Sequence, residues 1–465
     1  MRRKKAILWF QKDLRIHDNE ALLDASQFAE ELIPVYVFDE REINGSTDIL
    51  KECKTGRFRR QFLVDSVRDL RNSLQKMGTD LVIREGKSEE ILFSLAKEFD
   101  VDAVYCNRER TREEVYRQET LEKLLWSIGR EIRYSRGKML YHTADLPFPI
   151  THAPDCFQQF KKEVERFVAI RKPLAVEDIP SFSRKSIFEL GDLPDFGEEV
   201  VTIVKGGETV ALKNLETLLS SSSAKDEDSK FMKKQIEKLM IFLSDGCLSP
   251  KYLFHKLSEW KENVGNAAIL EYCFTALLWR DFYRLMGKKY RSLIFEPGGV
   301  KEKENKDASQ DITIFNIWKE GRTGIPYVDA CMKKLKSTGY LSNHEKKLVS
   351  SFLIYYLKVD WRLGAEYFEN LLINYDPCSV WGHWNYIAGI SSDNKDGVVV
   401  NCYREAQKYD PEGDLVREWI PSLNILPKKY IHKPFLLSEE EQLEFQIKLG
   451  ASYPMPVISP GKIMG

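Results

Sequence analysis

The sequence lacks the patterns of several large protein classes. Its 8 cysteines are scattered singly, with neither a C-x-x-C pair nor a Cys/His cluster at metal-ligand spacing. This argues against disulfides and structural zinc, and it predicts reduced thiols in the cytoplasm. The basic start, Met1–Lys5, leads into an apolar run that is too short for a signal peptide or a membrane span. The net charge of −1 provides no global basic field, so contact with nucleic acid depends on a local patch.

Short apolar runs alternate with helical patterns in the first third of the chain. The runs that we interpret as strands are Ala6–Phe10, Leu32–Phe38, Leu81–Arg84, Ala103–Cys106 and Glu131–Tyr134. Segments between them, such as Arg57–Met77, place apolar residues at helical spacing. This alternation predicts an α/β domain over residues 1–140, with a doubly wound parallel sheet. No G-x-G-x-x-G motif follows the first run, but a ligand site is still expected at the carboxyl ends of the strands.

The rest of the chain divides into three predicted parts. Prolines interrupt residues 141–229, which we expect to form a connector with one helix near Asp155–Val168 and a mobile Ser-rich tract, Ser220–Lys230. Apolar residues at 3.6-residue spacing predict an all-α domain over residues 230–430. Several prolines follow Pro427, and the tail at 431–465 is expected to be loosely packed. We expect a monomer.

The segment from Asp376 to Tyr386 is rich in aromatic residues. It reads D-P-C-S-V-W-G-H-W-N-Y and directly follows an amphipathic helix. Such density is rare in a surface loop and common around a planar aromatic ligand. We therefore interpret this segment as a turn that cradles such a ligand, with Asp376 buried.

Motifs in the same order along nearly the whole chain resemble the photolyase/cryptochrome family, and above all its DASH branch. The blocks are W-F-Q-K-D-L-R-I-H-D-N at Trp9–Asn19, L-W-R-D-F-Y at Leu278–Tyr283, T-G-I-P-Y-V-D-A at Thr323–Ala330, S-T-G-Y-L-S-N at Ser337–Asn343 and D-W-R-L-G-A-E at Asp360–Glu366. The aromatic segment is similar to the family's flavin-cradling turn, D-Y-D-x-C-S-N-Y-G-N-W. So many matching blocks make coincidence implausible.

This resemblance implies an antenna domain followed by a helical domain that holds FAD below a hole for a flipped nucleotide. The implied protein is a blue-light flavoprotein, a cryptochrome DASH or deoxyribodipyrimidine photolyase, that binds DNA. It would repair pyrimidine dimers by electron transfer from reduced FAD, mainly in single-stranded DNA, where extruding a base costs less. A folate antenna, 5,10-methenyltetrahydrofolate, is a further implied chromophore, and a photoreceptor role is the family's other known use of the fold.

The resemblance also assigns individual residues to the flavin. They are Arg280, Asn343, Lys346, Asn374, Asp376 and Val380. Arg280 has an alternative role in a helix-face salt bridge, and Asn343 in capping the following helix. Trp384 and Trp361 match the first two members of a tryptophan path for electrons, although both are equally typical of a core. The third tryptophan is missing, because Ala308 stands in its place.

Other residues are assigned to the substrate and to the antenna. Trp381 and Tyr386 would face the substrate and stack on bases. Glu114 matches the glutamate that holds the folate antenna, with an exposed helical carboxylate as the alternative. The basic clusters at 57–60 and 346–347 are candidates for DNA contact, although charge runs on helices are usually solvated faces.

Several residues depart from the family's pattern. Lys346 and Asn374 replace an arginine–aspartate pair that brackets the flavin ring, and Val380 replaces the asparagine that faces its reactive nitrogen. Ala276 replaces a glutamate that contacts the lesion, and Glu237 falls where hydroxyls bind the pyrophosphate. The alternative function is therefore a degenerate photolyase-fold protein with weak or absent FAD binding. Such a protein would bind nucleic acid or a partner without lyase activity.

Overall fold

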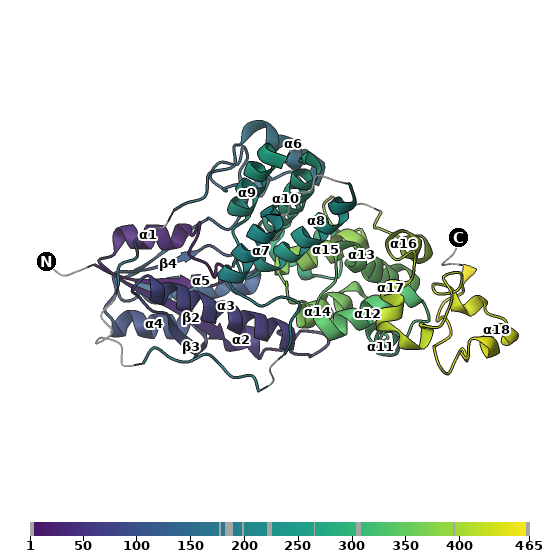
Figure 1. Ribbon diagram of the computed structural model, residues 1–465. Coiled ribbons are helices and arrows are strands. Elements are labelled where there is room, and N and C mark those ends of the chain that lie inside the picture. The colour runs from purple at the N-terminus through teal and green to yellow at the C-terminus, as the bar shows by residue number, and fades with distance from the viewer. Residues whose placement is uncertain are drawn as a thin grey trace. The chain divides into compact units, whose positions relative to one another are not determined.

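The computed structural model describes residues 4–175, 178–181, 189–197, 200–220, 226–264, 266–303, 308–393 and 396–461 (Figure 1). The chain forms two compact units, each assembled from separate stretches of sequence. The first consists of Met1–Ser46, Cys53–Ser292 and Ile373–Ser379, and the second of Thr47–Glu52, Leu293–Leu372 and Val380–Gly465. The domain boundaries expected from the sequence remain a prediction. Residues 221–225 of the Ser-rich tract lie outside the described residues.

A five-stranded sheet organises the first unit. The strands are β1 (Lys5–Phe10), β2 (Glu31–Asp39), β3 (Val82–Gly86), β4 (Ala103–Asn107) and β5 (Glu131–Ser135). All neighbours pair in parallel, in the order β3-β2-β1-β4-β5. The side chains of β1, β2 and β4 are almost continuously buried, as expected for strands covered on both faces. The predicted doubly wound α/β sheet is confirmed.

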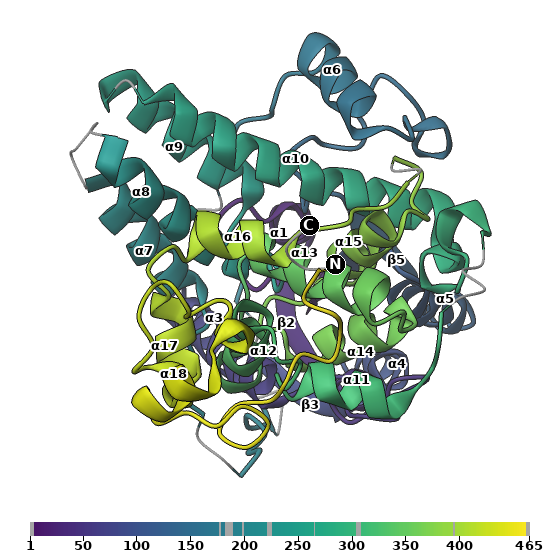
Figure 2. The same ribbon diagram turned by 90° about the vertical axis from the view of Figure 1, so that its right-hand side faces the viewer.

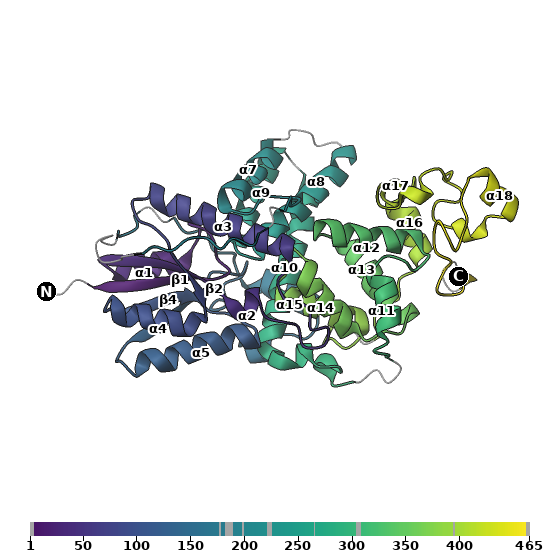
Figure 3. The same cartoon turned by 90° about the horizontal axis from the view of Figure 1, so that it is seen from below.

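Helices cover both faces of this sheet. They are α1 (Glu20–Phe28), α2 (Glu40–Ile43), α3 (Arg57–Lys76), α4 (Ser88–Glu98) and α5 (Arg112–Trp126). Figure 3 shows α3 on one side of the sheet and α4 with α5 on the other. The order of the strands reverses at β1 and β4, which directs ligands to the carboxyl ends of these strands.

The described residues of the first unit also form five α-helices beyond the sheet. They are α6 (Phe157–Phe167), α7 (Glu208–Ser220), α8 (Asp226–Leu239), α9 (Pro250–Val264) and α10 (Ala267–Tyr290). The helix expected near Asp155–Val168 is α6, but α7 is a second helix in the same segment. It buries Ala211, Leu215 and Leu218, which have helical spacing. The prolines and glycines that precede these residues obscured this short pattern.

The described part of the second unit is helical. Its helices are α11 (Ile312–Lys319), α12 (Pro326–Thr338), α13 (Asn343–Ser351), α14 (Trp361–Leu371), α15 (Pro377–Ala388), α16 (Cys402–Tyr409), α17 (Asp414–Trp419) and α18 (Glu439–Glu444). The first residues of α15, Pro377–Ser379, are counted with the first unit. The all-α domain expected after the connector is confirmed.

The aromatic segment is a helix, so its interpretation as a turn is wrong. The Asp376 side chain accepts hydrogen bonds from the main-chain N–H and the hydroxyl of Ser379, at 2.8 and 2.7 Å. Pro377 follows at the first helical position, where its fixed φ and missing N–H are favourable. An aspartate–proline start therefore initiates α15 and fixes which aromatic side chains share a face.

The tail after Pro427 is packed, contrary to the expectation from its prolines. Tyr430, Ile431, Leu437, Ile447 and Tyr453 belong to a buried apolar cluster in the second unit. The Tyr453 hydroxyl also donates a 2.6 Å hydrogen bond to Asp329 of α12. The segment is therefore held in the second unit by apolar residues that are widely spaced in the sequence and follow no regular periodicity.

No helix in the described part of the chain is long and apolar enough to cross a membrane. The eight cysteines are all free thiols.

Candidate functional site

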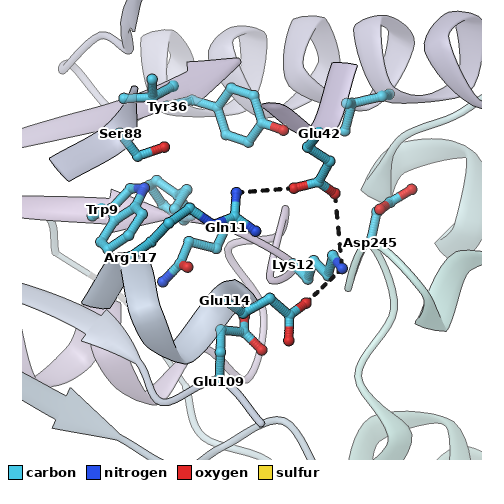
Figure 4. A pocket seen from close by; sticks show the side chains of 13 residues that line it. Trp9, Gln11, Lys12, Tyr36, Glu42, Ser88, Glu109, Glu114, Arg117 and Asp245 are labelled. Carbon is cyan, nitrogen blue, oxygen red and sulfur yellow. Dashed lines mark hydrogen bonds and ion pairs between the residues drawn. The ribbon is translucent and has the colours of Figure 1, made fainter. Parts of the chain in front are cut away.

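A small charged cavity lies at the carboxyl edge of the sheet, where a parallel doubly wound sheet is expected to bind ligands (Figure 4). Its volume is about 30 Å³, which is room for about two water molecules. The residues that line it are Trp9, Phe10, Gln11, Lys12, Tyr36, Val37, Glu42, Leu63, Ser88, Glu109, Glu114, Arg117 and Asp245. All of them belong to the first unit.

Ion pairs cross this cavity (Figure 4). Lys12 Nζ lies 2.6 Å from Glu114 Oε1 and 3.8 Å from Glu42 Oε1, and Arg117 Nη1 lies 3.1 Å from Glu42 Oε2. Burial alone would raise the pKa of Glu114, but Lys12 and Lys138 hold it well below its usual range. The Glu114 side chain is 8% exposed, so the alternative of an exposed helical carboxylate is wrong.

This cavity does not fit a folate. Glu114 points its carboxylate at Lys12 and at the Thr111 hydroxyl, which lies 2.6 Å from Oε2 and caps α5. A folate ring would have to displace these ion pairs and enlarge a space with room for only about two water molecules. The folate antenna stays a prediction.

Asp245 makes the stability of the first unit depend on pH. Burial raises the pKa of Asp245 to about 6, from an ordinary value of 3.8. The folded protein therefore binds this proton more strongly than the unfolded chain does. The resulting stabilisation is fully present below pH 3.8 and is lost as the pH rises through 6.

We expect Asp245→Asn to raise the free energy of unfolding at pH 8 by on the order of 2–3 kcal/mol, since no buried carboxylate remains to ionise. At pH 4 the variant and the wild type should unfold at similar urea concentrations. Urea unfolding at pH 4, 6 and 8 measures the difference, with the exposed Asp48→Asn as the control. A variant that keeps the pH dependence of the wild type would contradict this assignment.

Three of the predicted flavin residues lie in the first unit. Arg280 on α10 donates to the carbonyls of Lys138 at 2.9 Å and Leu243 at 3.2 Å, so main-chain oxygens hold its guanidinium. Burial lowers the pKa of Arg280 to about 10. Asp376 is buried, as predicted from the sequence, and caps α15. Asn374 lies two residues before it, and its Oδ1 is buried without a protein partner among the described residues.

The other three lie in the second unit. Asn343 is exposed at the start of α13, and the cap of this helix is Ser342, which forms a capping box with Glu345. The alternative role of Asn343 as a helix cap is therefore wrong. Lys346 is half-buried on the same helix, and Val380 is buried on α15. Their roles at a flavin stay predictions.

The two tryptophans of the predicted electron path are both buried in the second unit. Trp361 starts α14 and donates from Nε1 to the carbonyl of Pro297 at 3.1 Å. Trp384 on α15 lies against Gly364, one helical turn after Trp361. Its Nε1 is buried and has no partner in the described part of the chain. Ala308, the residue in place of the third tryptophan, lies outside any helix.

The predicted substrate residues differ in exposure. Trp381 is 6% exposed, and its ring packs edge-on against Trp361 and Phe295, at centroid distances of 5.6 and 4.9 Å. Tyr386 is half-buried. Stacking of either ring on a base stays a prediction.

The arginine cluster at the start of α3 is not a solvated face. Arg59 donates to the Lys54 carbonyl at 2.6 Å and stacks on Tyr375, and Arg60 donates to the carbonyls of Thr55 and Ile43. Arg57 is the exposed member of the cluster. Two of the three arginines therefore hold the loop before α3, and Arg57 with Lys347 keeps an exposed charge.

Two residues of the candidate site were not predicted from the sequence. Arg284 is buried one turn after Arg280 on α10, and its Nη1 lies 3.0 Å from Asp376 Oδ2. The pKa of Asp376 would rise by burial, but Arg284 and Arg280 hold it below its ordinary value. The four-residue spacing of the arginines was the available signal.

His383 replaces an asparagine of the family's turn. Burial and the nearby Lys346 lower the pKa of His383 to about 3, so this imidazole is neutral.

Glu237 does not present a free carboxylate. Its Oε1 accepts a 2.7 Å hydrogen bond from the hydroxyl of Tyr272 on α10. The tyrosine is neutral, so this bond orients the carboxylate without removing its charge, and the expected repulsion of phosphates stays a prediction.

Comparisons with known proteins cover nearly the whole chain. Residues 6–180 match the family model "DNA photolyase", and residues 273–462 match "FAD binding domain of DNA photolyase". The cryptochrome DASH of Synechocystis sp. is 35% identical and that of Xenopus laevis 36% identical. The alignments span 97% of this chain in both cases, and 95% and 89% of those proteins.

Solved structures of known proteins support the same family likeness. The structure of a Synechocystis cryptochrome has a TM-score of 0.88 at 33% identity, over 99% of this chain and 98% of that one. A bacterial class III photolyase from Agrobacterium tumefaciens has a TM-score of 0.81 at 27% identity, over 100% and 96% of the two chains.

The family match confirms FAD as the predicted cofactor. The residues of the first unit fit it, because Asn374 Oδ1 is a buried polar atom without a protein partner in the described chain. Such an atom requires a partner, and a bound flavin supplies donors. With this likeness over its full length, the chain belongs to the photolyase/cryptochrome family, in the cryptochrome DASH branch.

Proposed function

We propose that this chain is a light-driven DNA repair enzyme that splits pyrimidine dimers, mainly in single-stranded DNA. The observation that carries the proposal is the likeness to cryptochrome DASH over 97% of this chain and 95% of the Synechocystis relative. FAD, when bound, supplies the photochemical electron transfer. The protein would act as a monomer in the cytoplasm, where its eight free thiols stay reduced.

The residues of the chain would bind and orient the cofactor. Arg280, Asn343, Lys346, Asn374, Asp376 and Val380 would hold it. Asp376 is kept ionised by Arg284, so it can accept a hydrogen bond in a fixed position at the start of α15. Trp384 is fully buried, which keeps water from its indole. These groups position a ring and exclude solvent, while the chemistry belongs to the cofactor.

Two residues are expected to weaken contacts at the site, Ala276 with the substrate and Val380 with the flavin. Ala276 offers no carboxylate to a flipped base, so the complex would lose about 1–3 kcal/mol relative to a site with that acceptor. Val380 offers no hydrogen-bonding atom to the flavin. A preference for unstacked DNA would compensate, because less binding energy is needed to extrude the lesion.

The test is repair of an oligonucleotide with one thymine dimer by the FAD-loaded chain under blue light. We expect repair of the single-stranded oligonucleotide to exceed that of the duplex, and no repair in the dark. Trp384→Phe should repair normally after chemical reduction of FAD but lose reduction by light. A yellow protein without repair would support a photoreceptor instead. A colourless protein that takes up no FAD would support the alternative of a binding module without lyase activity.

A further inference from the structure

A second cavity lies in the first unit at the start of α3, and we call it the α3 cavity. Its volume is about 270 Å³, and Cys53, Arg57, Arg60, Gln61 and Phe196 are among the residues that line it. All of its lining residues belong to the first unit. Two are arginines, and none is an aspartate or a glutamate. The cavity therefore has room for a small organic molecule, and its charge favours an anion.

The two arginines of the α3 cavity present N–H groups to a ligand. The half-buried Arg60 donates from Nε to the Thr55 carbonyl at 2.8 Å and from Nη2 to the Ile43 carbonyl at 2.7 Å, so its guanidinium is fixed. Its Nη1 donates to no residue of the described chain. The exposed Arg57 side chain forms neither a hydrogen bond nor an ion pair with the described residues. Because the two arginines are three positions apart, they share a face of α3.

The carboxylates close to this cavity along the chain are engaged elsewhere. Asp65, further along α3, pairs with Arg68 at 2.9 Å. Glu42 pairs with Arg117 at 3.1 Å, on the side of the cavity at the sheet. Asp195 accepts a 2.8 Å hydrogen bond from the main chain of its own segment. No carboxylate in the described part of the chain forms an ion pair with either arginine of the α3 cavity, so the lining stays positive.

Phe196 of the connector forms an aromatic wall of the α3 cavity. Its half-buried ring has the guanidinium carbon of Arg60 5.1 Å from its centroid. The connector is fixed on both sides of this ring. Before it, Arg71 of α3 donates to the Gly191 carbonyl at 3.0 Å, and after it Gly206 packs so closely on α3 that a Cβ would lie 2.1 Å from a carbonyl oxygen. Figures 1 and 2 both show α7, which follows Gly206, beside α3. The wall is therefore in place before any ligand binds.

We propose that the α3 cavity binds the phosphate group of a small aromatic molecule. The phosphate oxygens would accept charge-assisted hydrogen bonds from Arg57 and from Nη1 of Arg60. The positive end of the α3 dipole adds to this attraction, since the N-cap residue Gly56 has no side chain to cap the helix. The aromatic ring would pack against Phe196 and fill space that a bare phosphate leaves to water.

A small molecule suits this cavity better than a DNA strand does. Within the basic cluster at 57–60, Arg57 alone is exposed, whereas a nucleic-acid backbone is bound by several exposed cations along one surface. None of the residues that carry the proposal is assigned to FAD or to a pyrimidine dimer. The proposal therefore does not rest on the proposed function.

Titration calorimetry of the full chain with phenyl phosphate tests the proposal, and inorganic phosphate is the comparison without a ring. Sodium chloride at equal ionic strength controls for general screening. We expect saturable binding of phenyl phosphate, at least threefold tighter than that of inorganic phosphate. Arg57→Ala should weaken it at least tenfold, and Phe196→Ala should remove the preference for the ring. The matched control Arg68→Ala, on the same helix, should leave binding unchanged.

Cys53 provides a second measurement at the cavity itself. Its Sγ lies 3.0 Å from Nη2 of Arg60, while Cys156 is an exposed thiol that does not line the cavity. Alkylation by N-ethylmaleimide, followed by mass spectrometry of the peptides, measures both thiols in one sample. Saturating phenyl phosphate should slow labelling of Cys53 at least threefold and leave labelling of Cys156 unchanged.

Several results would overturn the proposal. They are absence of saturable binding to the wild type, unchanged binding by Arg57→Ala, and equal affinity for phenyl phosphate and inorganic phosphate. Labelling of Cys53 that does not respond to phenyl phosphate would place the ligand elsewhere and would count equally against it. Displacement of phenyl phosphate by an unphosphorylated thymine oligonucleotide would identify a contact with DNA instead, and would also overturn it.

Discussion

Asp329→Ala is expected to lower the free energy of unfolding by about 3–5 kcal/mol, one of the largest effects of any single substitution in this chain. The fully buried carboxylate accepts four hydrogen bonds. The donors are the main-chain N–H groups of Thr323 and Gly324 and the hydroxyls of Thr323 and Tyr453, at 2.6 to 3.0 Å. Removing the acceptor leaves all four donors buried without a partner.

In Asp329→Ala, we expect the contact between α12 and the C-terminal segment to open before the rest of the second unit unfolds. Tyr453→Phe removes one of the four donors and serves as the matched control, with an expected loss of about 1 kcal/mol. Urea unfolding measures the stability, and limited proteolysis after residue 440 reports release of the tail. Equal stability of Asp329→Ala and Tyr453→Phe would contradict the four-bond arrangement.

Gly364→Ala is expected to destabilise the second unit by about 2–3 kcal/mol, although alanine favours helices by about 1 kcal/mol over glycine. A Cβ atom at position 364 would overlap Cη2 of Trp384 and lie 2.7 Å from Cδ2 of Leu353. Helix α14 and Trp384 of α15 would have to move apart, because neither the indole nor the helix backbone can yield.

Gly129→Ala is the control for this substitution. Gly129 has φ +70° and no atom near an added Cβ, so alanine there meets backbone strain but no overlap. We expect a loss of about 1 kcal/mol. The Gly364→Ala protein should also show altered tryptophan fluorescence, since Trp384 moves. A stability gain in Gly364→Ala, as in an exposed helix, would show that the two helices do not touch at this point.

The sheet and most helices could be predicted because their signals are local. Strands such as β1 are short apolar runs, and a helix such as α3 repeats its apolar residues every three or four positions. The prediction failed where the local signal was weak or misleading. Prolines suggested a loose tail, but its few large apolar residues are buried, and the aromatic segment was taken for a turn although Asp376 and Pro377 start a helix.

The candidate sites were only partly predictable. The sequence identified Asp376 and Glu114 as residues of interest, but not the groups that hold them. Lys12 lies 102 positions from Glu114, and Arg284 lies 92 positions from Asp376. No periodicity or spacing along the chain links residues so far apart.

The sequence alone determined the family, the parallel sheet, the helical second half and the residues expected at the flavin, because these depend on motifs and on local periodicity. Only the tertiary structure decided the state of each charge. It paired Glu114 with Lys12 and kept Asp376 ionised beside Arg284. The physical reason is that burial and counter-ions set the energy of a charged group, and both arise only when distant segments pack together.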